Sequence, residues 1–181
     1  MKYDPVEHHR RSIRLQGYDY ASPGAYFLTI CVQDRECLLG QVIDGKMQLN
    51  AHGRIVDEFW QEIPIHFSNV SVDAYVTMPN HIHAIAIIHD PTHPGKGGVS
   101  APQSRPTLGQ IVAYYKYQTT KIINQMRETR GARFWQRNYW EHIIRTETAN
   151  QRIYQYIQDN PVLWEDDQLH PDAPPNPFNR N

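Results

Sequence analysis

Two histidines separated by a single residue, His81 and His83, lie in an apolar stretch of this chain. The alternation of residues 81–89 predicts a β-strand, in which side chains two residues apart point to the same face. Both imidazoles would then project together on the side facing out of the core, while Ile82 points into it. Such a pair suits two ligands of one metal ion. Because the chain holds ten histidines, the pair fits equally well two unrelated polar residues on a solvated strand face.

A second polar group follows near the end of the chain, in the run YIQDNP at 156–161. Tyr156 and Asn160 are four residues apart on a predicted helix, so a phenol and an amide oxygen would share one helix face. Pro161 ends this helix directly after Asn160. Taken alone, the pattern also fits a core tyrosine followed by an asparagine at a helix end.

Together the two groups outline a phosphoryl-transfer chemistry. Two imidazoles and one amide oxygen leave coordination positions open, and this mixed set suits Mg²⁺ or Mn²⁺ better than a closed zinc site. Such a metal would polarise a phosphodiester as a Lewis acid. Tyr156 would attack phosphorus and form a covalent phosphotyrosine, from which a free 3′-hydroxyl could rejoin a strand.

The remaining pattern predicts the elements that must position these residues. Asp44-Gly45 indicates a hairpin turn, Asn50 a helix cap, and Pro64 the end of that helix. Thr146 or Thr148 would cap the last helix. Strands are expected at 25–32, 41–49, 70–78 and 81–89, helices at 51–63, 107–129 and before 160, and extended chain at 134–145. This order predicts an α+β fold with helices packed on an antiparallel sheet.

The chain divides into three expected regions. Residues 1–23 form a basic arm containing Arg10, Arg11 and Arg14. Residues 24–164 form a single domain, interrupted at 91–106 by a mobile Pro- and Gly-rich loop. Residues 165–181 form an acidic, Pro-rich tail without periodicity, which we expect to lack fixed structure.

The net charge of −1 hides an uneven distribution of charge along the chain. Residues 105–145 are strongly basic and contain only two acidic side chains, whereas the residues after 145 are mainly acidic. A local basic face matters more for phosphate binding than the total charge does. Lys116, Lys121 and Arg137 are the candidates for DNA contact within this region, and a merely solvated helix face explains the two lysines as well.

Cys31 and Cys37 are the only cysteines, and the sequence shows neither a signal peptide nor an apolar run long enough to span a bilayer. We therefore expect free thiols in a cytoplasmic protein without membrane contact.

Several runs of the sequence resemble a known family. MPNHIH at 78–83 resembles the HUH motif (histidine, hydrophobe, histidine) of single-tyrosine endonucleases. FWQRNYWEHIIR at 134–145 and YIQDNP at 156–161 are similar to the REP-associated tyrosine transposases, as are RRSIR at 10–14 and GAYFLT at 24–29. The resemblance extends from about residue 10 to residue 164, with its motifs in the family's order.

The resemblance implies a ferredoxin-like (RRM-like) sheet and Mg²⁺- or Mn²⁺-dependent cleavage of single-stranded DNA near hairpins, through a 5′-phosphotyrosine. It places the nucleophile on Tyr156 and the metal ligands on His81, His83 and Asn160. Asparagine rather than glutamine as the third ligand favours the REP-associated branch. In that branch the basic arm, here Arg10, Arg11 and Arg14, reads a tetranucleotide beside the hairpin. Relatives are monomers or homodimers.

Alternative assignments remain open at this point. Tyr114, followed four positions later by Gln118, is the one serious rival nucleophile, and Tyr154 is expected to be a core residue. The same fold could bind a single-stranded DNA or RNA hairpin without cutting it. It could also hydrolyse small phosphoesters with a metal and without Tyr156.

Overall fold

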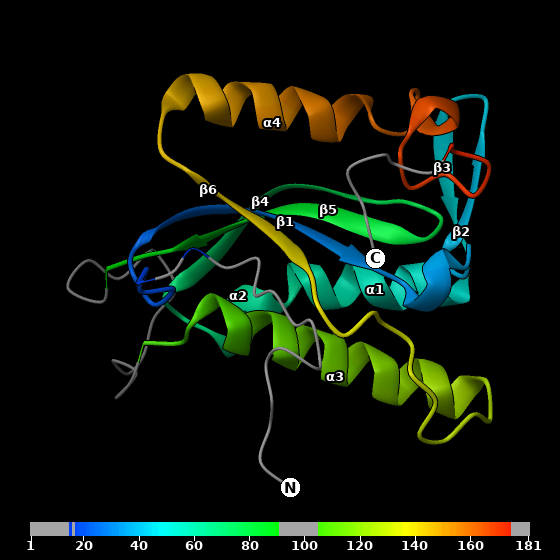
Figure 1. Cartoon of the computed structure of the whole chain (residues 1–181). Coiled ribbons are helices and arrows are strands. Elements are labelled where there is room, and N and C mark those ends of the chain that lie inside the picture. Colours follow the sequence, from blue (N-terminus) through cyan, green and yellow to red (C-terminus); the bar gives the residue numbers. More distant parts are fainter. Residues whose placement is uncertain (1–14, 16, 91–104, 175–181) are drawn as a thin grey trace, which may run out of the picture.

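A four-stranded antiparallel sheet, in the order β4-β5-β1-β6, forms the centre of the molecule (Figure 1). The structure is a computed structural model and describes residues 15, 17–90 and 105–174. The sheet consists of β1 (Gly24–Cys31), β4 (Val70–Thr77), β5 (His81–Ile88) and β6 (Trp140–Ile144). A separate hairpin consists of β2 (Gly40–Ile43) and β3 (Lys46–Leu49). The predicted α+β class, helices packed on an antiparallel sheet, is confirmed.

Helices cover both faces of the sheet. α1 (Ala51–Gln61), α2 (Ile63–His66) and α3 (Leu108–Met126) lie on one side, and α4 (Glu147–Asp159) lies across the other (Figure 1). Two short 3₁₀ helices, η1 (Gln33–Arg35) and η2 (Trp164–Asp166), follow β1 and α4. The last helix is therefore separated from α3 by the whole thickness of the sheet.

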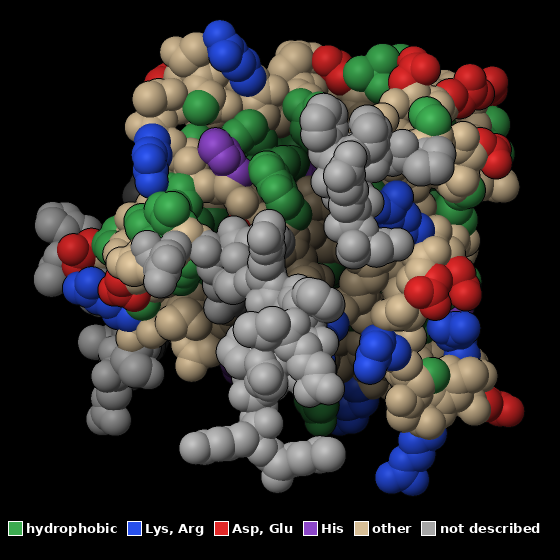
Figure 2. All heavy atoms as spheres, viewed as in Figure 1, with side chains coloured by type: hydrophobic (Ala, Val, Ile, Leu, Met, Phe, Trp, Pro, Cys, Tyr) green, Lys and Arg blue, Asp and Glu red, His purple; other side chains and the backbone are tan. Residues whose placement is uncertain are grey.

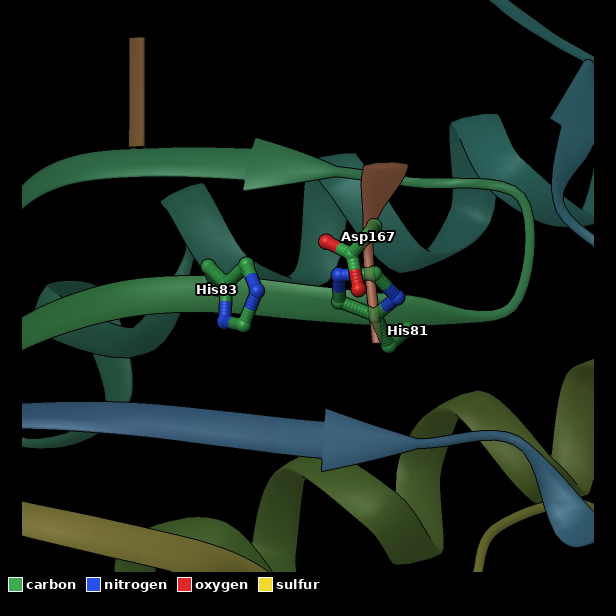
Figure 3. A group of neighbouring side chains, drawn as sticks. All are labelled: His81, His83 and Asp167. Carbon is green, nitrogen blue, oxygen red and sulfur yellow. The ribbon is translucent and has the colours of Figure 1, made fainter. Parts of the chain in front are cut away.

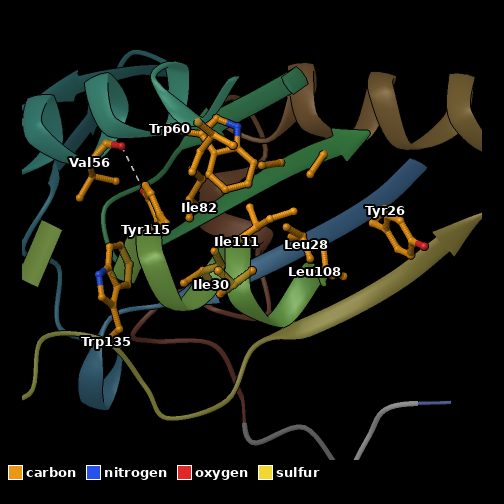
Figure 4. Close-up of a cluster of buried hydrophobic side chains, with 14 of the residues drawn as sticks. Tyr26, Leu28, Ile30, Val56, Trp60, Ile82, Leu108, Ile111, Tyr115 and Trp135 are labelled. Atoms are coloured by element: carbon orange, nitrogen blue, oxygen red, sulfur yellow. Dashed lines mark hydrogen bonds between the residues drawn. The ribbon is translucent and has the colours of Figure 1, made fainter. Parts of the chain in front are cut away.

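The main core lies between the sheet and the α1–α3 layer (Figure 4). Leu28, Ile30 and Ile82 supply fully buried aliphatic side chains from β1 and β5. Trp60 of α1 packs edge-on against Tyr115 of α3, with ring centroids 5.2 Å apart. The Tyr115 hydroxyl donates a hydrogen bond to the Val56 carbonyl at 3.1 Å, which satisfies a polar group inside this core.

A second, smaller apolar cluster lies beneath α4. It joins Phe27 of β1, Ala74 of β4, Ile85 of β5 and Ile157 of α4. The central strand β5 is consequently buried on both faces. The expectation that the histidine side of this strand faces out of the core is therefore wrong, because α4 and the residues after it cover that side.

The local signals in the sequence position the elements as expected, with one exception. The Asn50 side chain accepts from the Gly53 amide at 3.0 Å, and Thr146 accepts from the Ala149 amide at 3.1 Å. Asp44 and Gly45 both adopt positive φ, which fits a two-residue hairpin turn. Pro64 does not end α1; it lies in the first turn of α2, where no backbone N–H is needed.

The chain after α4 is more ordered than its composition predicts. Residues 165–174, expected to belong to a tail without fixed structure, continue from η2 and pack back on the molecule. The Asn80 amide donates to the Leu169 carbonyl at 2.7 Å, and Arg35 donates to the Gln168 carbonyl. Residues 175–181 lie outside the described part. Among the described helices, none has the length and apolar composition needed to cross a membrane.

Removing side-chain volume from the main core should destabilise the protein strongly. Ile30→Ala leaves a cavity under β1, and we expect the free energy of unfolding in urea to fall by about 2–5 kcal/mol. Ile65→Ala is the matched control, since that side chain is 82% exposed, and it should change stability by less than about 0.5 kcal/mol. Equal effects of the two substitutions would contradict the assignment of this core.

Candidate active site

His81 and His83 lie side by side on β5, with ring centroids 4.4 Å apart. Both point to the face covered by α4, as their spacing predicts, and both are almost completely buried. β5 is held between β4 and β1, so the backbone that carries the two rings is fixed from both sides. The pair is therefore a rigid, enclosed feature and not a solvated strand face.

Tyr156 of α4 reaches the nearer of these rings. Its hydroxyl lies 3.1 Å from Nε2 of His83, within hydrogen-bond distance. The other ring nitrogen of His83, Nδ1, lies 2.9 Å from the Thr29 hydroxyl of β1. With the proton on Nδ1, Nε2 accepts a hydrogen bond from the phenol. The last helix thus delivers a hydroxyl to the paired imidazoles.

His81 presents a nitrogen without a partner. Its Nδ1 lies 2.8 Å from Oδ1 of Asn80, and the Asn80 amide nitrogen donates to the Arg35 and Leu169 carbonyls. These two donations orient the Asn80 side chain, so Nδ1 of His81 carries the proton and Nε2 keeps its lone pair. Among the described residues, this buried Nε2 has no partner with hydrogen-bond geometry, and the Asn160 side chain lies close enough to raise the pKa of the ring. A fixed tautomer of this kind is typical of metal-ligating histidines.

Asn160 and Asp167 complete the group of polar atoms. Asn160, buried at the end of α4, donates its amide nitrogen to Oδ2 of Asp167 at 3.2 Å, while its Oδ1 is buried without a partner among the described residues. Ligand atoms of His81, His83 and Asp167 all lie within 4.8 Å of one another. Figure 3 shows the Asp167 carboxylate over the His81 ring.

Asp167 was not among the ligands expected from the sequence, because it lies in a segment expected to lack fixed structure. Its signal was present only as an acidic residue a few positions after Asn160-Pro161. The Leu169 amide donates to Oδ1 of Asp167 at 2.6 Å, which fixes the turn that brings the carboxylate back over the sheet. That turn is held by hydrogen bonds from Asn80, just before β5, and from Arg35 of η1, which no local pattern reveals.

Burial determines the protonation of the site. Desolvation lowers the pKa of His81 well below its usual value, with a contribution from His83, and lowers the pKa of His83 to about 3. Desolvation, followed by the charge of Asp167, raises the pKa of Tyr156 to about 12. Near neutral pH the imidazoles are therefore neutral, as metal ligands must be, and the phenol keeps its proton.

A cavity of about 560 Å³ opens onto these residues. Its walls include Thr29, His83, Tyr156 and Asn160, together with Gln136 and the segments 138–140 and 166–169. Among the described residues no Lys or Arg lines it, whereas Asp166 and Asp167 do. The site therefore has little positive charge of its own with which to hold a phosphate backbone.

The rival tyrosines lie elsewhere. Tyr114 is on α3, on the opposite side of the sheet, and stacks on His66 with ring centroids 3.8 Å apart. The expectation that Tyr154 is a core residue is wrong, because its side chain is 46% exposed on the outer side of α4. The structure thus places Tyr156, and not Tyr114 or Tyr154, beside the paired histidines.

The residues predicted to contact DNA fall into three groups in the structure. Arg10, Arg11 and Arg14 lie outside the described residues. Lys116 is engaged within the fold, since its Nζ donates to the carbonyls of Gln136 and Asn138, both at 2.9 Å. Lys121 and Arg137 are exposed and lie on a second cavity, between α3 and the segment that follows it.

The chain is similar in sequence to proteins of one bacterium. The chain is 43% identical over 182 residues to an uncharacterized protein of Haemophilus influenzae, across 94% of this chain and 98% of that protein. It is 26% identical over 171 residues to a second protein of that organism, provisionally named REP-associated tyrosine transposase, across 90% of this chain and 84% of the relative. No family model matches the sequence.

A solved structure of a REP-associated tyrosine transposase bound to a REP hairpin has the same fold. Its TM-score to this chain is 0.56, with 19% identity, over 84% of this chain and 73% of the other. The fold and the site define this chain as an α+β protein in which a tyrosine of the last helix faces paired histidines on a central antiparallel sheet. The chain belongs to one family with the uncharacterized H. influenzae protein, and its resemblance to the REP-associated tyrosine transposases is confirmed.

Removing the Asp167 carboxylate should loosen the end of α4. Asp167→Ala leaves the Asn160 and Leu169 donors without their acceptor. We therefore expect the free energy of unfolding, measured in urea with a chelator present, to fall by roughly 1–3 kcal/mol. Asp166→Ala removes an exposed neighbouring carboxylate and should leave stability within about 0.5 kcal/mol of wild type. A harmless Asp167→Ala would show that this segment does not depend on the carboxylate.

Proposed function

We propose that this protein is a metal-dependent, single-stranded DNA endonuclease and strand transferase that acts at hairpin DNA, with Tyr156 as its nucleophile. The observation that carries the proposal is the 3.1 Å approach of the Tyr156 hydroxyl to His83, beside two buried polar atoms without partners. Two similar proteins support a hairpin DNA substrate. One bears the provisional name REP-associated tyrosine transposase, and the other is a solved structure of such a transposase bound to a REP hairpin.

The residues present fit a divalent metal. His81 Nε2 and Asn160 Oδ1 are buried without partners, which is costly unless another group satisfies them. These two atoms, with His83 Nε2 and the Asp167 carboxylate, would hold Mg²⁺ or Mn²⁺ in a mixed nitrogen and oxygen set. A bound ion would supply Lewis-acid polarisation of a phosphodiester.

The chain's own groups perform the remaining chemistry. The Tyr156 oxygen forms a bond to phosphorus while the bond from phosphorus to the DNA 3′ oxygen breaks, leaving a 5′-phosphotyrosine and a free 3′-hydroxyl. In the overall reaction the phenol proton ends on the departing 3′ oxygen. Attack by another 3′-hydroxyl on the phosphotyrosine reverses these changes and restores the phenol. Phe27 packs against both the Tyr156 and the His83 rings, and Trp140 packs edge-on against Phe27, which keeps the phenol in position.

The covalent step is tested with a labelled single-stranded hairpin and Mn²⁺. We expect wild-type protein to form an adduct that survives denaturing electrophoresis, and Tyr156→Phe, which lacks only the hydroxyl, to form none. Tyr154→Phe is the matched control on the same helix, with a similarly exposed ring, and should form the adduct as wild type does. If wild type binds the hairpin but yields no adduct, the protein is a binding module without this chemistry.

The metal site is tested without reference to activity. Because a ligand that binds only the folded state stabilises it, Mn²⁺ at about 100 times its Kd should add roughly 2.7 kcal/mol to wild-type stability. His81→Ala should lose most of this Mn²⁺-dependent gain, while His66→Ala, an exposed histidine on α2, should keep it. If Mn²⁺ stabilised wild type, His81→Ala and His66→Ala equally, the ion would be bound at another site.

A further inference from the structure

A second cavity, of about 860 Å³, lies between α3 and the chain that follows it. One wall is the C-terminal half of α3, including Tyr117 and Lys121, and the other is the segment 130–137. Phe134 and Trp135, both buried, form its floor, and the Trp135 indole nitrogen donates to the Thr119 hydroxyl at 2.9 Å. The volume is within the range of ordinary ligand sites and is large enough for a nucleotide.

The rim of this cavity is strongly basic. Lys121, Arg130, Arg133 and Arg137 line it, against Glu128 as the single acidic side chain. None of the four cations forms an ion pair with another described residue. In Figure 2, Lys and Arg side chains stand over the end of α3 and the segment after it. A rim of unpaired cations on a pocket is suited to a phosphate backbone.

The cavity also offers a surface for a base. The Tyr117 side chain is 65% exposed and, among the described residues, contacts no other aromatic ring. Aromatic rings beside basic groups stack on unpaired bases, whereas the bases of a duplex are already stacked on one another. The combination favours a single strand over a double helix.

The second cavity adjoins the candidate active site. Gln136 lines both cavities, so only the segment around it separates them. This ridge is fixed, because the Gln136 amide donates to the Cys31 carbonyl at 2.9 Å and Lys116 holds the carbonyls of Gln136 and Asn138. A strand that leaves the Tyr156 site across this ridge enters the basic cavity directly.

We propose that the cavity between α3 and residues 130–137 binds the unpaired DNA strand that continues from the phosphate at Tyr156. Phosphates lie against the Arg133 and Arg137 side of the rim, and a base stacks on Tyr117. This inference rests on the proposed function, and it explains how an acidic active site retains its substrate: the cations that the site lacks stand in the neighbouring cavity.

The experiment measures DNA binding by fluorescence anisotropy in a Tyr156→Phe background, with a chelator present, so that it does not depend on cleavage. The probes are one labelled hairpin with blunt ends and the same hairpin with an unpaired flank on the 5′ or the 3′ side. Binding by Arg133→Ala/Arg137→Ala is compared with that by Lys46→Ala/Arg54→Ala, which removes two exposed cations that line neither cavity. Circular dichroism and thermal melting establish that each variant is folded.

We expect a flank on one side to tighten binding, and the cavity double variant to lose about tenfold in affinity for that probe alone. The slope of log affinity against log salt should become shallower by about 1.4, the value for two lost contacts to single-stranded DNA. Tyr117→Ala should weaken the flanked complex without changing the salt slope, because stacking releases no counterions. The control double variant should bind both probes as the parent protein does.

Three results would overturn the inference. Equal loss for blunt and flanked hairpins would show that the cavity holds the duplex stem. Unchanged binding by the cavity variants would show that DNA does not enter it, even where the Tyr156 adduct forms normally. An equal loss of affinity in the control double variant would show that total charge, and not this cavity, determines binding. The two proposals can also fail separately. If the cavity variants lose affinity only for the flanked hairpin while wild-type protein forms no adduct, this inference stands and the proposed chemistry is refuted.

Discussion

The burial of one side of β5 by α4 is the constraint on which the rest of the site depends. Ile157 anchors α4 in an apolar cluster with Phe27, Ala74 and Ile85, so the helix lies at a fixed height above the sheet. The residue before this anchor, Tyr156, is then directed to the His83 ring, and Asn160, one turn further along α4, lies beside His81. The same packing removes water from both imidazoles and keeps them neutral.

This arrangement is costly for stability and favourable for chemistry. Buried nitrogen and oxygen atoms without partners oppose folding, because their hydration is lost and nothing replaces it. The site holds two such atoms, His81 Nε2 and Asn160 Oδ1, within a few ångströms of a carboxylate. An apolar core that covers the opposite face of β5 offsets the penalty. Binding sites commonly keep atoms of this kind ready for a ligand.

Charge is distributed between two neighbouring cavities. The pocket at Tyr156 is lined by Asp166 and Asp167, which suits a cation, while the pocket beyond Gln136 is lined by Arg and Lys, which suits a polyanion. Lys116 lines the second pocket but is used structurally, because it donates to the Gln136 carbonyl, and desolvation lowers its pKa to about 8. A net charge of −1 conceals this division, because the 18 Lys and Arg side chains of the whole chain nearly balance its 19 Asp and Glu side chains.

The sequence by itself determined the class of fold and the paired side chains. Alternation puts His81 and His83 on one strand face, and a spacing of four puts Tyr156 and Asn160 on one helix face, because both follow from the period of a single element. The capping residues likewise act within a few positions. Tertiary structure alone decided that these two faces meet, that Asp167 returns over the sheet, and that Lys116 and Arg137 have different surroundings. Each of these depends on contacts between segments far apart in the chain, and no local periodicity encodes such contacts.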